Sequence, residues 1–321
     1  MSKNDLPKNS GAYKLVHDVN LSDVCIPDSG LLMIDLAGHF IRPADEKRIF
    51  NLKNANTVLI LYDSSKYVRE DQKVKHKYSL DHKGRYILND KDGKFEFSGG
   101  ALYGNALNGG GVTIEKSSVF VNNGANLIGN FAKDGGAVDN HGIFVNETNS
   151  VIAGNVAEVG GAVCNKDGEF LNGGTINNNF AIMKGAGLFN TGIFMIKGDS
   201  KFSDNYILDD KKSTNLLTKH DDIHYELQNK PECGIFNTIY IIDKINCKDN
   251  SYVIFEGDSP VFNNNKIFDS YDLYAKDIPL DVYKVYYQDK LYAISKKTDG
   301  NVSIAAFINA AKIPLNIVRY L

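Results

Sequence analysis

Residues 134–180 read DGGAVDNHGIFVNETNSVIAGNVAEVGGAVCNKDGEFLNGGTINNNF, and one pattern occurs twice within them. Gly135-Gly136-Ala137-Val138 returns 25 residues later as Gly160-Gly161-Ala162-Val163. The pattern extends over the region from Gly99 to Tyr206, where equivalent residues recur every 24 to 26 positions. Self-similarity at a fixed period of this length is the signature of a repeat protein, in which one supersecondary unit is copied along the chain.

Several kinds of residue recur in register within these repeats. The aromatic column is Phe120, Phe144, Phe170 and Phe194; the aliphatic column is Ile128, Ile152, Ile176 and Phe202; one asparagine column is Asn130, Asn155, Asn179 and Asn205; and another is Asn122, Asn146 and Asn172, followed by Ile196. We expect the apolar columns to point inward as a continuous core. The asparagines are expected at corners, where they tolerate left-handed dihedrals and their amides can bond to the next copy, and the paired glycines are expected at corners that need a positive φ.

Each copy holds three short apolar runs rich in Val, Ile and Phe, which are separated by Gly, Asn and Asp. This pattern is typical of strands and turns rather than helices. About 25 residues with three strands is the size of one coil of a parallel β-helix, where each strand pairs with its copy about 4.8 Å along the axis. The sequence therefore predicts an all-β fold: a single parallel β-helix of eight to eleven coils, right-handed by the crossover rule, with capped ends and two projecting loops.

The predicted organisation has three parts. Residues 1–30 are expected to form an N-terminal tail or cap, 31–277 the β-helix, and 278–321 a C-terminal hairpin and cap. Two segments break the period and are expected to project from the solenoid as insertions, at 64–85 and 208–231. Loops inserted into solenoids are common places for binding residues.

The repeat phrases resemble those of a known group of surface proteins. They are Gly-Gly-Ala-Leu at 99, Gly-Gly-Ala-Val at 135 and 160, Phe-x-x-Asn at 120–123, 202–205 and 262–265, NGGTINNN at 172–179 and LMIDLAGHFI at 32–41. Together they are similar to the GGA[ILV]/FxxN repeats of bacterial surface β-helix proteins, resembling the chlamydial polymorphic outer-membrane protein family. The resemblance covers about residues 30–210. It implies a secreted or cell-surface β-helix used in adhesion, in some cases as an outer-membrane autotransporter passenger.

Composition limits the partners. The formal net charge of −3 and the lack of a basic face argue against nucleic acid. No apolar run reaches 18 residues, so no membrane-spanning segment is expected. Residues 1–20 contain no cationic segment followed by an apolar core, so no signal peptide is visible. The expected localisation, cell surface or secreted, therefore comes from the resemblance, and a fragment, another export route or an intracellular location stay open.

The first insertion contains a basic run that is a candidate ligand-binding surface, with a solvated hairpin as the alternative. The candidate residues are Lys73, Lys75, His76 and Lys77, which could hold an anionic glycan or a negatively charged surface. Four cysteines, Cys25, Cys164, Cys233 and Cys247, match no metal pattern. Buried free thiols are expected, although a bridge between Cys233 and Cys247 stays open.

Catalysis would require paired carboxylates or a positioned base. The repeats offer mainly Asn, Gly and Ser, and no acidic column follows the repeat. If the chain is an enzyme, the first candidates are Asp209, Asp210, Asp221 and Asp222 in the second insertion. His220 and His224 could share a metal only on one helical turn, and no third ligand follows at a diagnostic spacing, so no metal or cofactor is expected.

The sequence thus favours a non-catalytic, adhesin-like β-helix that presents a binding surface for glycans or host or bacterial surface proteins. Two alternatives stay open. One is a polysaccharide lyase or glycoside hydrolase built on the same scaffold, and the other is an intracellular or phage-derived structural solenoid.

Overall fold

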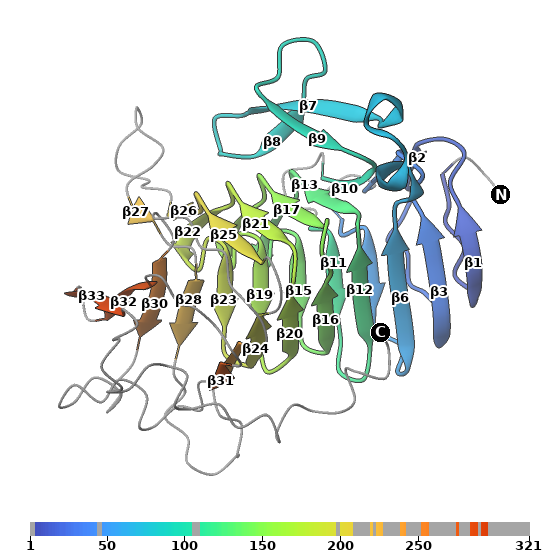
Figure 1. The fold of residues 1–321 in the computed structure, drawn as a ribbon. Helices are drawn as coiled ribbons and strands as arrows, with labels where there is room; N and C mark the ends of the chain where they lie inside the picture. The colour runs from blue at the N-terminus through green and yellow to red at the C-terminus, as the bar shows by residue number, and fades with distance from the viewer. Residues whose placement is uncertain are drawn as a thin grey trace.

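The computed structural model describes residues 4–43, 47–104, 110–196 and 200–207, together with the backbone of short strands between 219 and 294. The chain is all-β, with 50% of residues in strands and 4% in helices, and its parallel sheets form a β-solenoid of about seven turns. Each coil takes about 25 residues, as predicted. Figure 1 shows the coils stacked side by side along one axis.

Three long sheets run along the solenoid. Sheet A contains β1 (Gly11–Lys14), β3 (Gly30–Asp35), β6 (Thr57–Tyr62), β12 (Val119–Asn123), β16 (Ile143–Asn146), β20 (Glu169–Asn172), β24 (Ile193–Ile196), β29 (Thr238–Ile241) and β31 (Tyr274–Ala275). Sheet B contains β2 (Val19–Asn20), β4 (Phe40–Arg42), β10 (Ala101–Tyr103), β13 (Asn126–Ile128), β17 (Val151–Ala153), β21 (Thr175–Asn177) and β25 (Lys201–Ser203). Sheet C contains β5 (Phe50–Leu52), β11 (Val112–Ile114), β15 (Val138–Asn140), β19 (Val163–Asn165), β23 (Leu188–Asn190), β28 (Ile223–Glu226), β30 (Tyr252–Glu256), β32 (Tyr283–Tyr287) and β33 (Lys290–Ile294).

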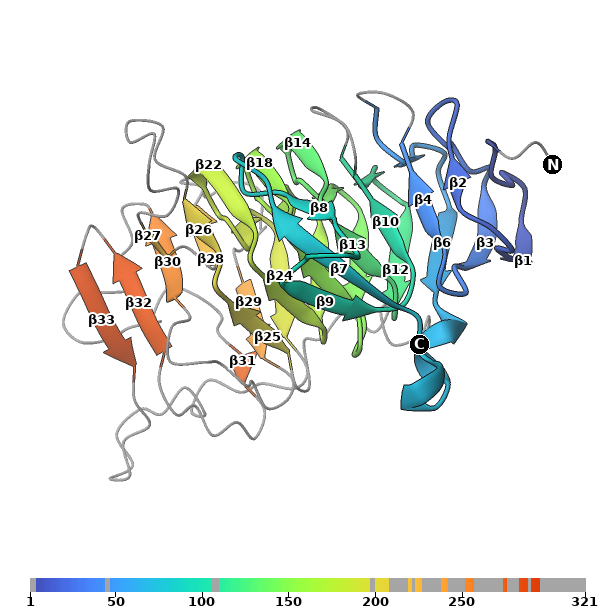
Figure 2. The same cartoon turned by 90° about the horizontal axis from the view of Figure 1, so that it is seen from above.

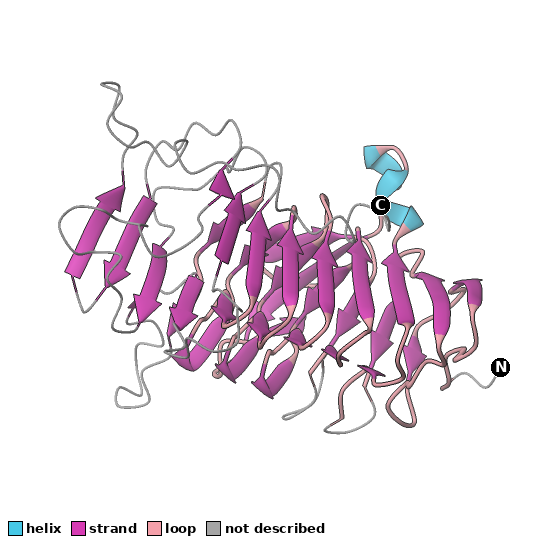
Figure 3. Cartoon of the chain, turned by 90° about the horizontal axis from the view of Figure 1, so that it is seen from below, coloured by secondary structure: helices cyan, strands magenta, loops and turns pink. Residues whose placement is uncertain are grey.

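A fourth sheet, sheet D, adds one more strand to the coils than the three expected. It contains β14 (Phe131–Asp134), β18 (Val156–Val159), β22 (Phe180–Lys184), β26 (Tyr206–Ile207) and β27 (Lys219–His220). In β14 the sequence hides this strand, because Phe131-Ala132 is followed at once by Lys133 and Asp134. Its pairing is nevertheless parallel from coil to coil between β14 and β26. Figure 3 shows the strands of successive coils lying parallel.

The ends of the described chain continue the same pattern. β1 pairs in parallel with β3, and β2 with β4, so part of the segment expected as a cap forms the first rungs of sheets A and B. At the other end, β32 pairs in parallel with β30 and antiparallel with β33, which confirms the predicted hairpin.

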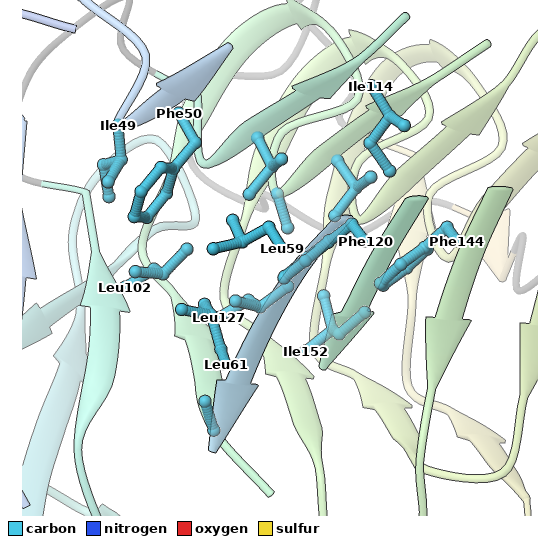
Figure 4. Close-up of a cluster of buried hydrophobic side chains, with 14 of the residues drawn as sticks. Ile49, Phe50, Leu59, Leu61, Leu102, Ile114, Phe120, Leu127, Phe144 and Ile152 are labelled. Carbon is cyan, nitrogen blue, oxygen red and sulfur yellow. The ribbon is translucent and has the colours of Figure 1, made fainter. Parts of the chain in front are cut away.

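The predicted aromatic column is the spine of the core. Phe120, Phe144, Phe170 and Phe194 are register partners in sheet A. The ring centroids of the three successive pairs lie 5.2, 4.8 and 5.2 Å apart, and every ring is buried. Figure 4 shows Phe120 and Phe144 standing parallel inside the coil, with Leu127 and Ile152 below them.

The aliphatic column was predicted one residue out of register at its first member. Leu127, not Ile128, pairs with Ile152, and Leu127 belongs to the inner core. Ile128 pairs with Ala153 and faces outward, where it is buried under the insertion described below. A shift of one residue moves a strand side chain to the opposite face of the sheet. The step to Ile152 is 24 residues from Ile128 and 25 from Leu127, and both steps fit the repeat, so spacing alone could not distinguish the two residues.

The asparagine columns are buried hydrogen-bonded ladders. Asn130, Asn155, Asn179 and Asn205 are joined by Nδ2–H donors to the next Oδ1 at 2.9 Å each. A left-handed residue stands immediately before each of them: Gly129 (φ +68°), Gly154 (+60°), Asn178 (+53°) and Asp204 (+59°). The expectation that the ladder asparagines themselves are left-handed was therefore wrong, whereas the expected amide bonding is confirmed.

The two glycines of a pair have different structural roles. Gly135, Gly160 and Gly185 have φ between +56° and +68°, as expected for a corner. The second glycine of a pair is needed for close packing between coils, because a Cβ on Gly161 would lie 2.3 Å from the backbone oxygen of Phe180. The Gly99-Gly100 pair occupies a different corner, immediately before β10 of sheet B.

Candidate functional site on the insertion

The first insertion is a small folded unit rather than a free loop. It begins with two 3₁₀ turns, η1 (Ser64–Tyr67) and η2 (Glu70–Gln72). An antiparallel sheet follows, in which β7 (Lys75–Leu80) pairs with both β8 (Tyr86–Leu88) and β9 (Phe95–Ser98). The insertion therefore runs from 64 to 98, and the predicted end at 85 falls inside the turn between β7 and β8.

An aromatic core fixes this unit against the outer face of sheet B. Tyr78 and Tyr86 are fully buried, and they form a cluster with outward-facing residues from four successive rungs of the sheet. The sheet residues are Phe40 on β4, Ala101 and Tyr103 on β10, Ile128 on β13, and Val151 and Ala153 on β17. Figures 1 and 2 show β7, β8 and β9 lying across the strands of sheet B.

Polar contacts fix the point where the insertion leaves the solenoid. The buried carboxylate of Asp63 accepts from the backbone N–H of Gly38 at 3.0 Å and of Gly100 at 2.5 Å, and it also caps η1. Lys66 Nζ donates to Asn126 Oδ1 at 2.6 Å and to the Asn149 carbonyl at 3.0 Å. Burial lowers the pKa of Lys66 to about 8. Lys66 therefore acts as an anchor and is not a free surface cation.

The candidate basic residues have acidic neighbours within the insertion. Lys73 Nζ lies 2.7 Å from Glu70 Oε2, and Lys75 Nζ lies 3.0 Å from Glu70 Oε1 and 3.6 Å from Glu96 Oε1. The insertion contains nine Lys and Arg residues against six Asp and Glu residues. The structure thus places the candidate lysines on a mixed-charge surface rather than on a basic one.

His76 and Lys77 lie on the same strand in different surroundings. The His76 ring packs on Phe40 with a centroid distance of 4.5 Å, and its Nδ1 lies 3.5 Å from Asp90 Oδ1. Its side chain is only 16% exposed. The backbone N–H of Lys77 donates to Asp90 at 2.9 Å. His76 is thus largely a packing residue between the insertion and sheet B.

Exposed apolar side chains are concentrated on the insertion. Within the described part of the chain, eight large apolar residues are exposed, and five of them lie here: Tyr67, Val68, Val74, Leu80 and Ile87. Three of these fall in one short stretch beside the 3₁₀ turns, where the Tyr67 ring stacks on Tyr62 of sheet A at 5.4 Å. We call Tyr62, Tyr67, Val68 and Val74 the Tyr67 patch. In the sequence these residues are hidden among the many charged residues of the segment.

A second cluster of charged residues lies on the outside of sheet C. Arg48 Nη1 and Nη2 donate to the carbonyls of Gly135 at 3.2 Å and Asp134 at 2.5 Å, and Nη2 lies 3.7 Å from Asp139 Oδ2. His141 Nε2 lies 3.5 Å from Asp139 Oδ1, and Lys166 Nζ lies 3.0 Å from Asp134 Oδ1. Burial raises the pKa of Asp139 against the opposing effect of Arg48.

The remaining candidates are inert or lie outside the described residues. Cys25 and Cys164 are buried free thiols, as expected, and burial raises the pKa of Cys25 to about 12. Cys233, Cys247 and the candidate carboxylates Asp209, Asp210, Asp221 and Asp222 lie outside the described residues. His220 lies on strand β27 and His224 on strand β28. The two residues therefore do not share a helical turn, which was the arrangement that a shared metal would have required.

Comparison with protein-family models, with curated proteins and with solved structures found no match to this chain. Across the described residues, no helix is long and apolar enough to span a membrane.

Proposed function

We propose that this chain is a non-catalytic, adhesin-like scaffold, displayed on a cell surface or secreted, that holds a glycan or a surface protein at the Tyr67 patch. One observation carries the proposal: exposed apolar residues gather on a folded insertion that the solenoid core does not need for its own packing. Exposed apolar side chains concentrated on one part of a surface, with polar groups beside them, are typical of interaction sites. Tyrosine contributes a rigid apolar ring with a polar tip, which suits both sugar faces and protein surfaces.

The mixed charges around the patch fit this role. Arg69 is exposed at the edge of the patch, and the lysine and glutamate pairs nearby are close to the surface. Charged pairs at a rim steer partners and set specificity more than they add affinity. The candidate residues Lys73 and Lys75 would thus contribute at the edge of the site, with Tyr67 and its apolar neighbours at the centre.

The test is a panel of purified polysaccharides, host glycans and surface proteins, scored in parallel for retention of the protein and for release of new sugar ends. The variant is Tyr67→Ser with Val68→Ser and Val74→Ser. The matched control is Leu80→Ser with Ile87→Ser, at the far end of the same insertion. We expect retention without release, lost in the first variant and kept in the control. Retention that survives the first variant would contradict a site at the patch.

A polysaccharide-processing enzyme is the second candidate, and the cluster on sheet C favours it. The pKa of Asp139 is raised by burial, Asp134 belongs to the same cluster, and a perturbed carboxyl group near a second carboxylate is a candidate for an acid or base role. Release of sugar ends by the wild-type chain, lost in Asp139→Asn, would support this candidate and overturn the non-catalytic proposal.

A further inference from the structure

Sheet A carries two apolar rows on its outer face. The first row is Leu31, Val58, Val119 and Ile143, and the second is Met33, Ile60, Val121, Val145 and Leu171. Members of each row are register partners on β3, β6, β12, β16 and β20, so the rows form a continuous stripe across five rungs. Glu169 continues the first row and is the one charged residue in the stripe over these rungs.

Burial in the second row increases away from the N-terminal end, whereas the first row is buried at Val119 and partly buried at Ile143 and Glu169. Leu31 is 47% exposed, whereas Val119, Val121, Val145 and Leu171 fall to 8, 5, 3 and 2%. Side chains on an uncovered sheet face are reached by solvent from above, so these values indicate a cover over β12, β16 and β20. The described members of this apolar cluster all come from strands of sheet A itself, so the described part of the chain supplies no second layer.

The C-terminal segment of the chain has the composition of such a cover. Residues 302–321 read VSIAAFINAAKIPLNIVRYL, in which 14 of 20 residues are apolar. The two charged residues are the bases Lys312 and Arg319, and there is no acid that would repel Glu169. The other long segments outside the described residues all contain acidic residues.

Residues 302–321 are also long enough to cross the stripe. Five strands about 4.8 Å apart span about 19 Å across their axes. A 20-residue segment covers about 30 Å as a helix and up to about 70 Å when extended. Either conformation can cross the stripe from β20 to β6.

We propose that residues 302–321 dock in cis on the outer apolar stripe of sheet A and cover Val119, Val121, Val145 and Leu171. The segment then serves as an intramolecular clasp that holds successive rungs together from outside. An open stripe would be an adhesive apolar face, so docking of the segment also keeps single chains apart.

The chain contains no tryptophan, so the substitution Ile143→Trp places one fluorescent reporter in the first row of the stripe. A second reporter chain carries Val145→Trp instead, at a position of the second row that is 3% exposed, and the conclusions rest on this chain. In the full chain the emission is measured together with quenching by iodide. Two further chains carry the same reporter: one ends at residue 301, and the other keeps full length with Phe307→Asp and Ile308→Asp. Far-ultraviolet circular dichroism confirms that all three retain the β-solenoid.

The expected result is short-wavelength emission and weak quenching in the full chain. In both altered chains emission should move to longer wavelength, and the iodide quenching constant should rise several-fold. Long-wavelength emission already in the full chain would overturn the proposal, because the stripe would be open. Short-wavelength emission in all three chains would also overturn it, and dependence on protein concentration would identify a second copy as the cover.

Discussion

Adjacent asparagines have different roles in this fold. Asn178 holds a left-handed backbone with φ +53°, whereas Asn179 is a buried ladder residue. The two N–H groups of the Asn179 amide are shared among three acceptors, the Ile152 and Asn177 carbonyls at 3.0 Å and Asn205 Oδ1 at 2.9 Å. Its oxygen accepts from the backbone and side chain of Asn155 at 3.0 and 2.9 Å. One residue position thus separates a conformational role from a hydrogen-bonding role.

This difference predicts opposite outcomes for neighbouring substitutions. Asn179→Ala leaves buried donors and acceptors unpaired, and we expect the free energy of unfolding to fall by about 2–4 kcal/mol. Asn178→Gly keeps the left-handed corner, and we expect a change below about 0.5 kcal/mol. Urea denaturation measures both. Equal losses in the two variants would contradict the assignment of the ladder.

Glu169 predicts a pH dependence. Burial among apolar neighbours raises its pKa above the ordinary 4.5, so the folded chain holds this proton more tightly than the unfolded chain. The associated stability is present at acid pH and is lost as the pH rises through 4.5 toward the raised folded value. We therefore expect Glu169→Gln to be more stable than the wild type at pH 7, with a smaller difference at pH 4.

Urea midpoints at the two pH values measure the effect, with the exposed Glu115→Gln as the matched control. A difference that is constant with pH, or that has the opposite sign at pH 7, would show that Glu169 is not desolvated as described.

Residue patterns predicted part of this arrangement. The phenylalanine stack and the asparagine ladder followed from spacing, because equivalent residues in a β-helix must meet in neighbouring coils. A third ladder, Asn140 to Asn165 to Asn190, follows the same step and was missed. Spacing alone could not show that Leu127, rather than Ile128, points into the core of the coil. Both residues are apolar and both are buried, Leu127 inside the coil and Ile128 outside it.

At the scale of elements, the insertion shows how a projecting segment becomes a fixed one. The Tyr78 and Tyr86 rings are fully buried between β7–β9 and sheet B, yet both hydroxyls lack a hydrogen-bond partner among the described residues. The backbone N–H of Tyr86 donates to the Gly154 carbonyl at 3.0 Å, and the Leu88 N–H donates to the Tyr103 hydroxyl at 2.8 Å. The rings therefore act through packing and the backbone supplies the polar contacts.

We expect two substitutions of Tyr86 to have opposite effects on stability. Tyr86→Phe removes an unpaired buried hydroxyl, so we expect a neutral or slightly stabilising effect on unfolding. Tyr86→Ala opens a cavity and should cost about 3–5 kcal/mol. Limited proteolysis should cut the alanine variant within 64–98 first, and the phenylalanine variant no faster than the wild type. Rapid cutting of the wild-type insertion would contradict the docked arrangement.

The sequence predicted that this insertion exists but not how it folds. The period breaks after Tyr62, which placed the start correctly. The aromatic residues of β8 and β9 look like ordinary strand residues, so nothing local shows that they pack on Phe40 and Tyr103, which lie in other coils. The candidate site also moved because of folding. Glu96 on β9 meets Lys75 only because β7 and β9 lie side by side, and Glu70 on η2 pairs with both Lys73 and Lys75.

At the scale of the whole molecule, the coils depend on their neighbours, as in other solenoids. The insertion adds a connection of another kind, because its core touches β4, β10, β13 and β17 at once. A unit that contacts four rungs cannot move without disturbing all of them. The surface it presents is therefore expected to stay fixed relative to the axis, and a preorganised surface loses less entropy on binding.

Amide hydrogen exchange in the native chain measures whether the solenoid holds the insertion as a fixed surface. We expect the amides of β7, which pairs with β8 and β9, to exchange at rates close to those of β12 and β16 in the solenoid. Exchange of β7 at the rate of an unstructured segment, with β12 and β16 protected, would contradict it.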